Sequence, residues 1–278
     1  METINSRQFS QSTVQLYKTK IDCSIKFYPT VWREELTIVK IDSNSVRIII
    51  DGNCFTANQG DFVIIRPFAL HSFSPAESES ALSIVSIRLR NLDANNTENH
   101  SFGALLSFFH EKNAPYLIKT DNGYYSEIAS IITRINDTAD SETAEENIFL
   151  LFKTIYENRL PARKYDMTVE KRCFAAKKIL EYISCNYTDT ISVKTLADEC
   201  GYSEFYIMKL FKQFTGISCI EYVNGYRIMQ ACKLLAETNT DANDIARQIG
   251  YTNISYFNRQ FKRLTGCTPL VMRLTMRK

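Results

Sequence analysis

Histidine is scarce in this sequence, and the cysteines are not arranged to replace it as metal ligands. The 278 residues include only three histidines, His71, His100 and His110. The eight cysteines form no Cys-x-x-Cys pair, which disfavours a zinc ribbon and a thioredoxin-like motif. A single histidine in the strand-forming region cannot hold a metal alone. We therefore expect no metal site and no cofactor, with reduced cysteines packed in a core.

Long hydrophobic runs are also missing. No apolar stretch approaches the ~18 residues that a membrane-spanning helix needs. The first residues, METINSRQFSQ, are polar and lack the apolar centre of a signal peptide. We expect a cytoplasmic protein with no membrane partner.

The charge of the two halves differs in sign. Residues 169–278 carry 16 Lys and Arg against 10 Asp and Glu, a net of +6, whereas residues 1–168 carry 17 against 21, a net of −4. A basic half behind an acidic half is typical of a nucleic-acid-binding module joined to another domain. A modest asymmetry of this kind is also common without any such role.

The region from about 23 to 90 is typical of short strands. Its β-branched segments and turn residues are found at 36–41, 46–50, 51–53, 61–65 and 83–87. Closely spaced strands of this kind predict a small sandwich or barrel. Helical spacing follows at about 102–158, where one apolar stripe begins at Tyr125 and another at Ile148. These helices would either cover the open face of the β-domain or pair with another subunit.

A segment without periodicity separates the two halves. Pro161 lies in it, and we place a linker at 161–168 between a first domain, 1–160, and a second, 169–278. Everything after the linker is predicted to be helical. The chain is therefore expected to be an α+β protein of two domains.

The second domain contains an internal repeat, at 192–214 and 241–265. The shared pairs are Leu196-Ala197 with Ile245-Ala246, Gly201-Tyr202 with Gly250-Tyr251, Phe211-Lys212 with Phe261-Lys262, and Thr215-Gly216 with Thr265-Gly266. Gly201 and Gly250 suit a tight turn that needs a positive φ angle. Ser203 and Asn253 are good N-caps for the helices that follow. A helix, a glycine-containing turn and a second helix predict two helix-turn-helix units. The second unit has one extra residue, in its turn or at the start of the next helix.

The second helix of each unit has an apolar inner face and a more polar outer face. In this motif that helix enters the major groove with its N-terminal residues near the base edges. Arg259 could pair with guanine and Asn258 with adenine, while Phe205 and Ile254 could meet thymine methyl groups. The other outward residues are Glu204, Met208, Lys209 and Lys212 in the first unit and Ser255 and Lys262 in the second. The N-cap residues Ser203 and Asn253 are also predicted to bind DNA. A solvated helix face explains any one of them, but two aligned units argue against that explanation for the set.

One helix is predicted to connect the units, over Ser218–Ala236. At ~1.5 Å per residue it spans roughly 28 Å, close to the ~34 Å between successive major-groove faces of one duplex. A rigid spacer of this length would hold both outer faces on adjacent grooves. Arg227 lies on this helix and is either a salt-bridge residue or a phosphate contact.

These motifs resemble those of one known family. Tyr222–Leu235 runs YVNGYRIMQACKLL, and Asp244–Pro269 runs DIARQIGYTNISYFNRQFKRLTGCTP. Both are similar to the C-terminal DNA-binding domain of AraC/XylS-type regulators, over about 169–274. The resemblance implies binding to double-stranded DNA through two major grooves, and control of transcription initiation, often through RNA polymerase. It places base-facing positions at Phe205, Tyr206, Met208, Lys209, Ile254, Ser255, Asn258 and Arg259. The family more often has polar residues where this chain has Met208 and Ile254.

The first domain has a weaker resemblance. Gly60–Pro67, followed by His71, is similar to the second half of a cupin motif. In regulators of this family a cupin-like β-barrel commonly senses a small molecule and forms a homodimer. Trp32, Arg33 and His71 are candidate effector-binding residues, although a core position for Trp32 and a strand cap for His71 are the simpler alternatives. Two other functions stay open, namely a regulator without an effector and a cupin-type enzyme with a DNA-binding tail.

Overall fold

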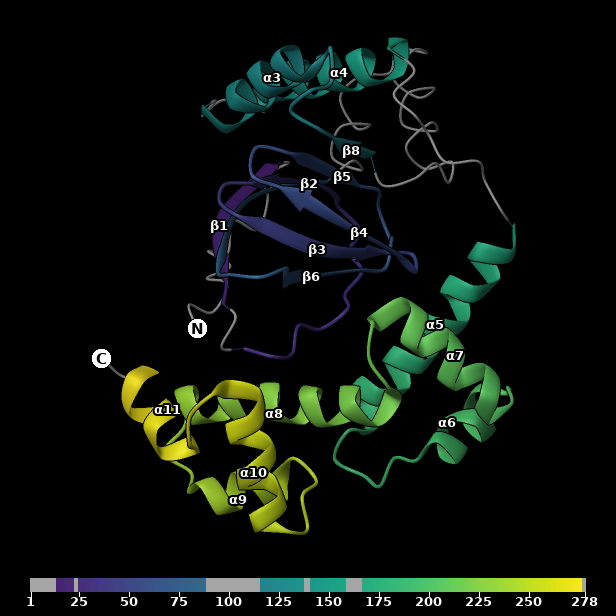
Figure 1. The fold of residues 1–278 in the computed structure, drawn as a ribbon, viewed down its shortest axis with the longest axis vertical. Coiled ribbons are helices and arrows are strands. Elements are labelled where there is room, and N and C mark those ends of the chain that lie inside the picture. Colours follow the sequence, from purple (N-terminus) through teal and green to yellow (C-terminus); the bar gives the residue numbers. More distant parts are fainter. Residues whose placement is uncertain (1–13, 23–24, 89–115, 138–140, 159–166, 277–278) are drawn as a thin grey trace.

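A computed structural model describes residues 14–22, 25–88, 116–137, 141–158 and 167–276. Its described residues form two parts, a front domain up to residue 158 and a helical domain from residue 167 (Figure 1). The order of an α+β front domain and an all-α second domain is therefore confirmed. Most of the linker predicted at 161–168 and the helix predicted at 102–110 lie outside the described residues.

The front domain contains eight described strands in two antiparallel sheets. They are β1 (Val14–Ile21), β2 (Leu36–Ile41), β3 (Ser45–Ile50), β4 (Asn53–Asn58), β5 (Phe62–Ile65), β6 (His71–Pro75), β7 (Ser80–Ile87) and β8 (Tyr116–Ile118). The five-stranded sheet has the order β1-β7-β2-β5-β8, and the three-stranded sheet has the order β4-β3-β6. Within the described ranges the strands make a sandwich of two sheets and not one closed barrel, which corrects the barrel geometry expected from the cupin resemblance.

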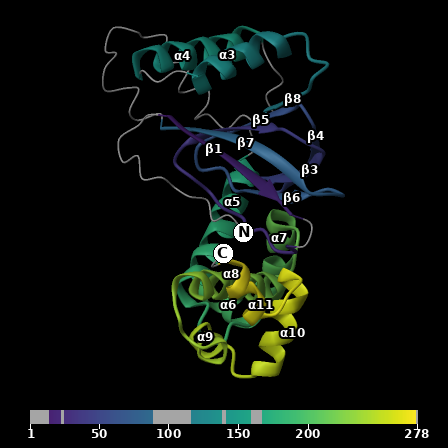
Figure 2. The same ribbon diagram turned by 90° about the vertical axis from the view of Figure 1, so that its left-hand side faces the viewer.

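The five-stranded sheet is buried on both faces. Val39 and Ile41 of β2 pack toward the three-stranded sheet, whereas Ile38 packs with helices on the opposite face. Those helices are α3 (Tyr125–Asp137) and α4 (Ser141–Glu157), which lie over the sheet in both views (Figures 1 and 2). Their predicted apolar stripes are buried in the same cluster. Within this chain the helices therefore cover the β-domain, as one of the two alternatives proposed.

The predicted strand region began too late and ended too early. β1 starts at Val14, before residue 23, and β8 follows residue 90. The residues of β1 alternate between half-buried and exposed along most of its length, because β1 is an edge strand beside β7. An edge strand of this kind has a weak hydrophobic signal.

The helical domain contains seven described helices. They are α5 (Met167–Asn186), α6 (Val193–Cys200), α7 (Glu204–Thr215), α8 (Cys219–Glu237), α9 (Ala242–Gln248), α10 (Ile254–Thr265) and α11 (Pro269–Met276). The helix α8 has 19 residues and starts one residue after the predicted position, because Ser218 is its N-cap and forms a capping box with Glu221. In Figure 1, α6 and α7 lie at one end of α8, and α9 and α10 lie at the other.

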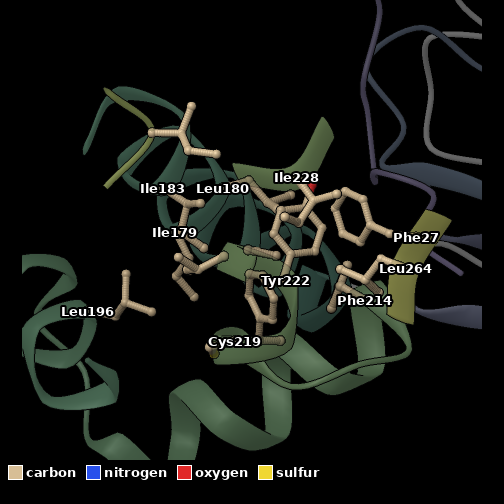
Figure 3. Close-up of a cluster of buried hydrophobic side chains, with 14 of the residues drawn as sticks. Phe27, Ile179, Leu180, Ile183, Leu196, Phe214, Cys219, Tyr222, Ile228 and Leu264 are labelled. Atoms are coloured by element: carbon tan, nitrogen blue, oxygen red, sulfur yellow. The ribbon is translucent and has the colours of Figure 1, made fainter. Parts of the chain in front are cut away.

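One hydrophobic core extends through the helical domain and includes two residues of the front domain. Ile179, Leu196, Phe214 and Leu264 belong to it, and so does Phe27 from the β1–β2 connection (Figure 3). The Phe27 ring lies 5.2 Å from the Tyr222 ring in an edge-on arrangement. Four cysteines are buried in this core, as expected, namely Cys173, Cys200, Cys219 and Cys232. Two others, Cys54 and Cys185, are exposed.

A second contact between the domains is polar and centres on Asp51. This buried carboxylate accepts hydrogen bonds from Arg66 at 2.7 Å and from the backbone N–H of Leu70 at 3.0 Å. The thiol of Cys173, on α5, donates to the same carboxylate at 3.4 Å. Burial raises the pKa of Cys173 to about 12, so the thiol remains protonated as the donor.

Candidate DNA-binding surface

Each helix-turn-helix unit begins its second helix with a side-chain cap. The hydroxyl of Ser203 accepts a hydrogen bond from the backbone N–H of Tyr206 at 3.3 Å. In the second unit Asn253 accepts from the N–H of Tyr256 at 2.9 Å. These caps satisfy N–H groups that have no partner within a helix. Both predicted N-caps are confirmed, and both second helices have 12 residues.

The turns that precede these helices depend on glycine. Gly201 has φ 76° and Gly250 has φ 88°, values that residues with a side chain rarely adopt. The turn of the first unit has two residues between Gly201 and α7, and that of the second has three between Gly250 and α10. The extra residue of the repeat therefore lies in the turn.

The inner faces of both second helices are buried, as predicted. Their apolar residues are Ile207, Leu210, Phe211 and Phe214 on α7, and Phe257, Phe261 and Leu264 on α10. Ala197 and Ala246, on the first helices, are also buried. Burial on one face orients each second helix and presents the opposite face to solvent.

The opposite faces carry the predicted DNA-binding residues. The exposed ones are Ser203, Glu204, Phe205, Met208, Lys209 and Lys212 on the first unit, and Asn253, Ser255, Asn258, Arg259 and Lys262 on the second. Tyr206 and Ile254 are half-buried and pack against the core. Phe205 is 73% exposed and Met208 is 49% exposed, so the outer face of α7 presents two large apolar side chains to solvent.

Arg259 is supported by an aromatic neighbour. Its guanidinium lies 5.2 Å from the centre of the Tyr256 ring, within the range of a cation–π contact. Asn258 and Arg259 lie in the N-terminal half of α10, which is the part of a recognition helix nearest to base edges. This geometry can present a planar guanidinium and an amide to hydrogen-bonding base edges.

Comparison with known proteins identifies the same region. The family model described as "Helix-turn-helix domain" matches residues 196–275. The probable transcription factor PqrA of Proteus vulgaris is 35% identical over 83 residues, which are 30% of this chain and 68% of that protein. This chain belongs to the AraC/XylS family of helix-turn-helix transcriptional regulators.

Other relatives of this AraC/XylS-family regulator match it over different lengths. The bifunctional transcriptional activator and DNA repair enzyme AdaA of Bacillus subtilis is 40% identical over 91 residues, or 33% of this chain. The chain spans 43% of AdaA, so the match includes less than half of that protein. The uncharacterized regulator YdeC of Bacillus subtilis is 23% identical over 265 residues, which are 92% of this chain and 90% of YdeC.

The front domain of the regulator touches the first unit at one end of α7. Gln213 donates a hydrogen bond to the carbonyl of Gly52 at 3.4 Å, and Gly216 lies beside the side chain of Ile49. Both residues belong to the C-terminal end of the unit, whereas Phe205 and Lys209 belong to the N-terminal part of α7 and remain exposed. The contact thus leaves the predicted DNA-binding face of α7 open among the described residues.

The three effector-binding candidates lie near the contact between the domains. Trp32 is half-buried and packs against the helical core. His71 is buried, pairs with Val31 through the backbone, and places Nδ1 2.9 Å from the carbonyl of Ala69. Burial, with a smaller contribution from Arg33, lowers the pKa of His71 to about 4, so its ring is neutral near pH 7. These contacts favour the structural alternatives for Trp32 and His71.

Sequence reasoning missed the residues that connect the domains. Phe27 lies in the predicted strand region but before its first strand-like segment, 36–41, and Asp51 was assigned only to a turn. The turn assignment itself is confirmed, with Asp51 at φ 47°. A charged residue next to a turn gives no sequence signal for a partner such as Cys173, which is 122 residues away. Among the described residues there is no group of three or more His, Cys, Asp or Glu that could hold a metal ion, and no described helix is long and apolar enough to cross a membrane.

Proposed function

We propose that the regulator binds a specific DNA site by placing α7 and α10 in two adjacent major grooves of one duplex. The observation that carries this proposal is that both units bury one helix face and expose the other, at the two ends of α8. With 19 residues, α8 is roughly 28 Å long, which compares with the ~34 Å between successive grooves on one side of a duplex.

The two faces would read DNA in different ways. Asn258 and Arg259 offer amide and guanidinium groups for hydrogen bonds with adenine and guanine. Phe205 and Met208 offer apolar contacts with thymine methyl groups, and Ile254 does the same from a half-buried position. The lysines Lys209, Lys212 and Lys262 and the capped helix starts at Ser203 and Asn253 suit phosphate contacts.

The remaining parts of the proposal concern partners. A regulator of this family would act on transcription in the cytoplasm, through RNA polymerase, without catalysing a reaction itself. We also propose control by a small-molecule effector and a homodimer, both on the basis of the family resemblance. The front domain supports such control because it contacts the helical domain at Phe27 and Asp51. A regulator with no effector is the alternative, and it is favoured by the packed positions of Trp32 and His71.

Selection of duplexes from random DNA by the full chain tests the main proposal. We expect enrichment of a site with two short conserved blocks about one helical turn apart. Binding of that site should weaken steeply with salt concentration, because phosphate contacts release counterions. Failure to retain any duplex at low ionic strength would overturn the proposal. A change in melting temperature with candidate metabolites would test the effector separately.

A further inference from the structure

The connection between α5 and α6, residues 187–192, leads into the first unit but lies against the second. Arg227, near the middle of α8, holds it there. We infer that Arg227 is a positioning residue that clamps the two helix-turn-helix units at one spacing, so that the protein accepts only one distance between its two DNA half-sites. The inference rests on the proposed binding to two grooves.

The guanidinium of Arg227 donates two hydrogen bonds to the α5–α6 connection. Its Nε donates a hydrogen bond to the carbonyl of Tyr187 at 2.6 Å, and its Nη2 donates to the carbonyl of Asp189 at 2.6 Å. Two donors in a rigid plane hold two carbonyls of one loop, which a lysine ammonium cannot reproduce. The Tyr226 ring, 5.3 Å from that of Tyr187, packs on the same loop from the same helix.

The same guanidinium also contacts the second unit. It lies 5.4 Å from the centre of the Tyr251 ring, in the turn before α10. Tyr251 is buried, and its hydroxyl donates to the side-chain carbonyl of Asn224, on α8, at 2.9 Å. Its ring lies 5.9 Å from Tyr256, which in turn supports Arg259. A continuous set of contacts therefore joins the loop that leads into the first unit to the second helix of the second unit.

Gly250 provides independent evidence for the close approach. A Cβ atom at this position would lie 2.8 Å from the carbonyl carbon of Thr188, in the clamped loop. The equivalent Gly201 of the first unit has no heavy atom within 4 Å of such a Cβ. Of the two turn glycines, only Gly250 is thus pressed against the backbone of the α5–α6 connection. The turn with the extra residue also buries its tyrosine, Tyr251, whereas the equivalent Tyr202 of the first unit is only half-buried.

The contacts of Arg227 suit a positioning role better than the two roles that the sequence suggested, a salt bridge and a phosphate contact. The partners of its N–H groups are backbone carbonyls and not carboxylates. The residue is also half-buried, and burial lowers its pKa below the usual range. Nε and Nη2 donate to the loop, and the guanidinium carbon lies over the Tyr251 ring, so the geometry favours positioning over a phosphate contact.

The test uses the full chain and the duplex that the wild-type protein selects from random DNA. One or two base pairs are inserted or deleted between the two half-sites, and the affinity for each duplex is measured. We expect the wild type to lose affinity on the order of a hundredfold when the spacing no longer allows both units to bind. We expect Arg227→Lys to bind the selected spacing more weakly and to lose most of the discrimination between spacings. Lys233→Ala, an exposed position on the same helix, is the matched control and should keep the wild-type profile.

Two further measurements separate the possible outcomes. A duplex with only the half-site of the second unit should bind Arg227→Lys and wild type equally, which also shows that this unit remains folded. If Arg227 instead contacts a DNA phosphate, Arg227→Lys should keep the wild-type affinity and the wild-type preference for one spacing. That result would overturn the clamp. Tolerance of altered spacing by the wild type would overturn it without any variant. If the wild type selects no duplex at all, the proposed function fails first.

Discussion

The two helix-turn-helix units have the same architecture but different surroundings. The first unit contacts the front domain at the C-terminal end of α7, where Gln213 meets Gly52 in the β3–β4 turn and Gly216 meets Ile49 of β3. The second unit meets the front domain at the backbone N–H of Lys26, which donates to the carbonyl of Leu264 at 3.0 Å. The outer face of the first unit presents Phe205 and Met208, and that of the second presents polar and basic residues.

This difference teaches that two copies of one fold can keep the same buried helix face while their exposed faces differ in chemistry. The inner faces are nearly interchangeable because both must bury a helix against α8 and close a glycine turn. The outer faces are not restricted by packing, so they can diverge toward apolar contact in one unit and hydrogen bonding in the other. The front domain, through its contact with α7, is positioned to act on the first unit more directly.

The largest expected effect on stability comes from Phe27, the front-domain side chain that packs in the helical core. Phe27→Ala should lower the free energy of unfolding by about 3–5 kcal/mol, because it leaves a cavity beside Tyr222 and Gly225. Urea denaturation measures the change. Phe205→Ala is the matched control, since its ring is 73% exposed, and should change stability by about 0.5 kcal/mol or less while weakening DNA binding. Equal losses for both variants would contradict the assignment of core and surface.

The equivalent turn glycines sharpen the comparison between the units. Gly201→Ala should cost about 1–2 kcal/mol, from its left-handed backbone alone. Gly250→Ala should cost about 2–5 kcal/mol, because overpacking against Thr188 adds to the same strain. Thermal or urea unfolding of the two variants gives the difference directly. Equal costs would mean that the second turn is not pressed against the α5–α6 connection.

A pH dependence is expected on the front-domain side of the molecule. The pKa of His71 is about 4 in the folded protein and about 6.5 when unfolded, so the unfolded chain binds the proton more tightly. Stability from the neutral ring is present above pH 6.5 and is lost as the pH falls toward 4. The loss attributable to His71 should be about 2 kcal/mol at pH 5 relative to pH 7.5. The free energies of unfolding of the wild type and of His71→Gln, measured at both pH values, isolate the contribution of His71. Equal changes with pH in the two proteins would exclude that contribution.

The smallest effects concern the equivalent outer positions Lys209 and Arg259. Arg259→Ala should cost about 1–3 kcal/mol of binding energy and relax preference at one base position. Lys209→Ala should weaken all sequences by a smaller, uniform amount and reduce the salt slope by about one. Affinities for a panel of single-base variants at two salt concentrations distinguish these outcomes. A uniform loss for Arg259→Ala would instead make that residue a phosphate contact.

The parts of the site that sequence reasoning predicted depend on residues close together in the chain. The caps at Ser203 and Asn253, the turns at Gly201 and Gly250, and the buried stripe that includes Phe211 all follow from spacings of one to four residues. Such spacings place side chains on one helix face whatever the rest of the protein does. The limits of the strand region were wrong at β1, because an edge strand with half-exposed side chains leaves a weak pattern.

The amino-acid sequence by itself determined that two capped and glycine-turned units would form around a 19-residue helix, since local backbone preference and helical periodicity decide those features. Only the tertiary structure decided that the strands would divide into two sheets, that Phe27 would enter the helical core, and that Arg227 would hold the carbonyls of Tyr187 and Asp189. These contacts join residues about 40 to 200 positions apart, and the energy of such a contact depends on burial and geometry that no short segment contains.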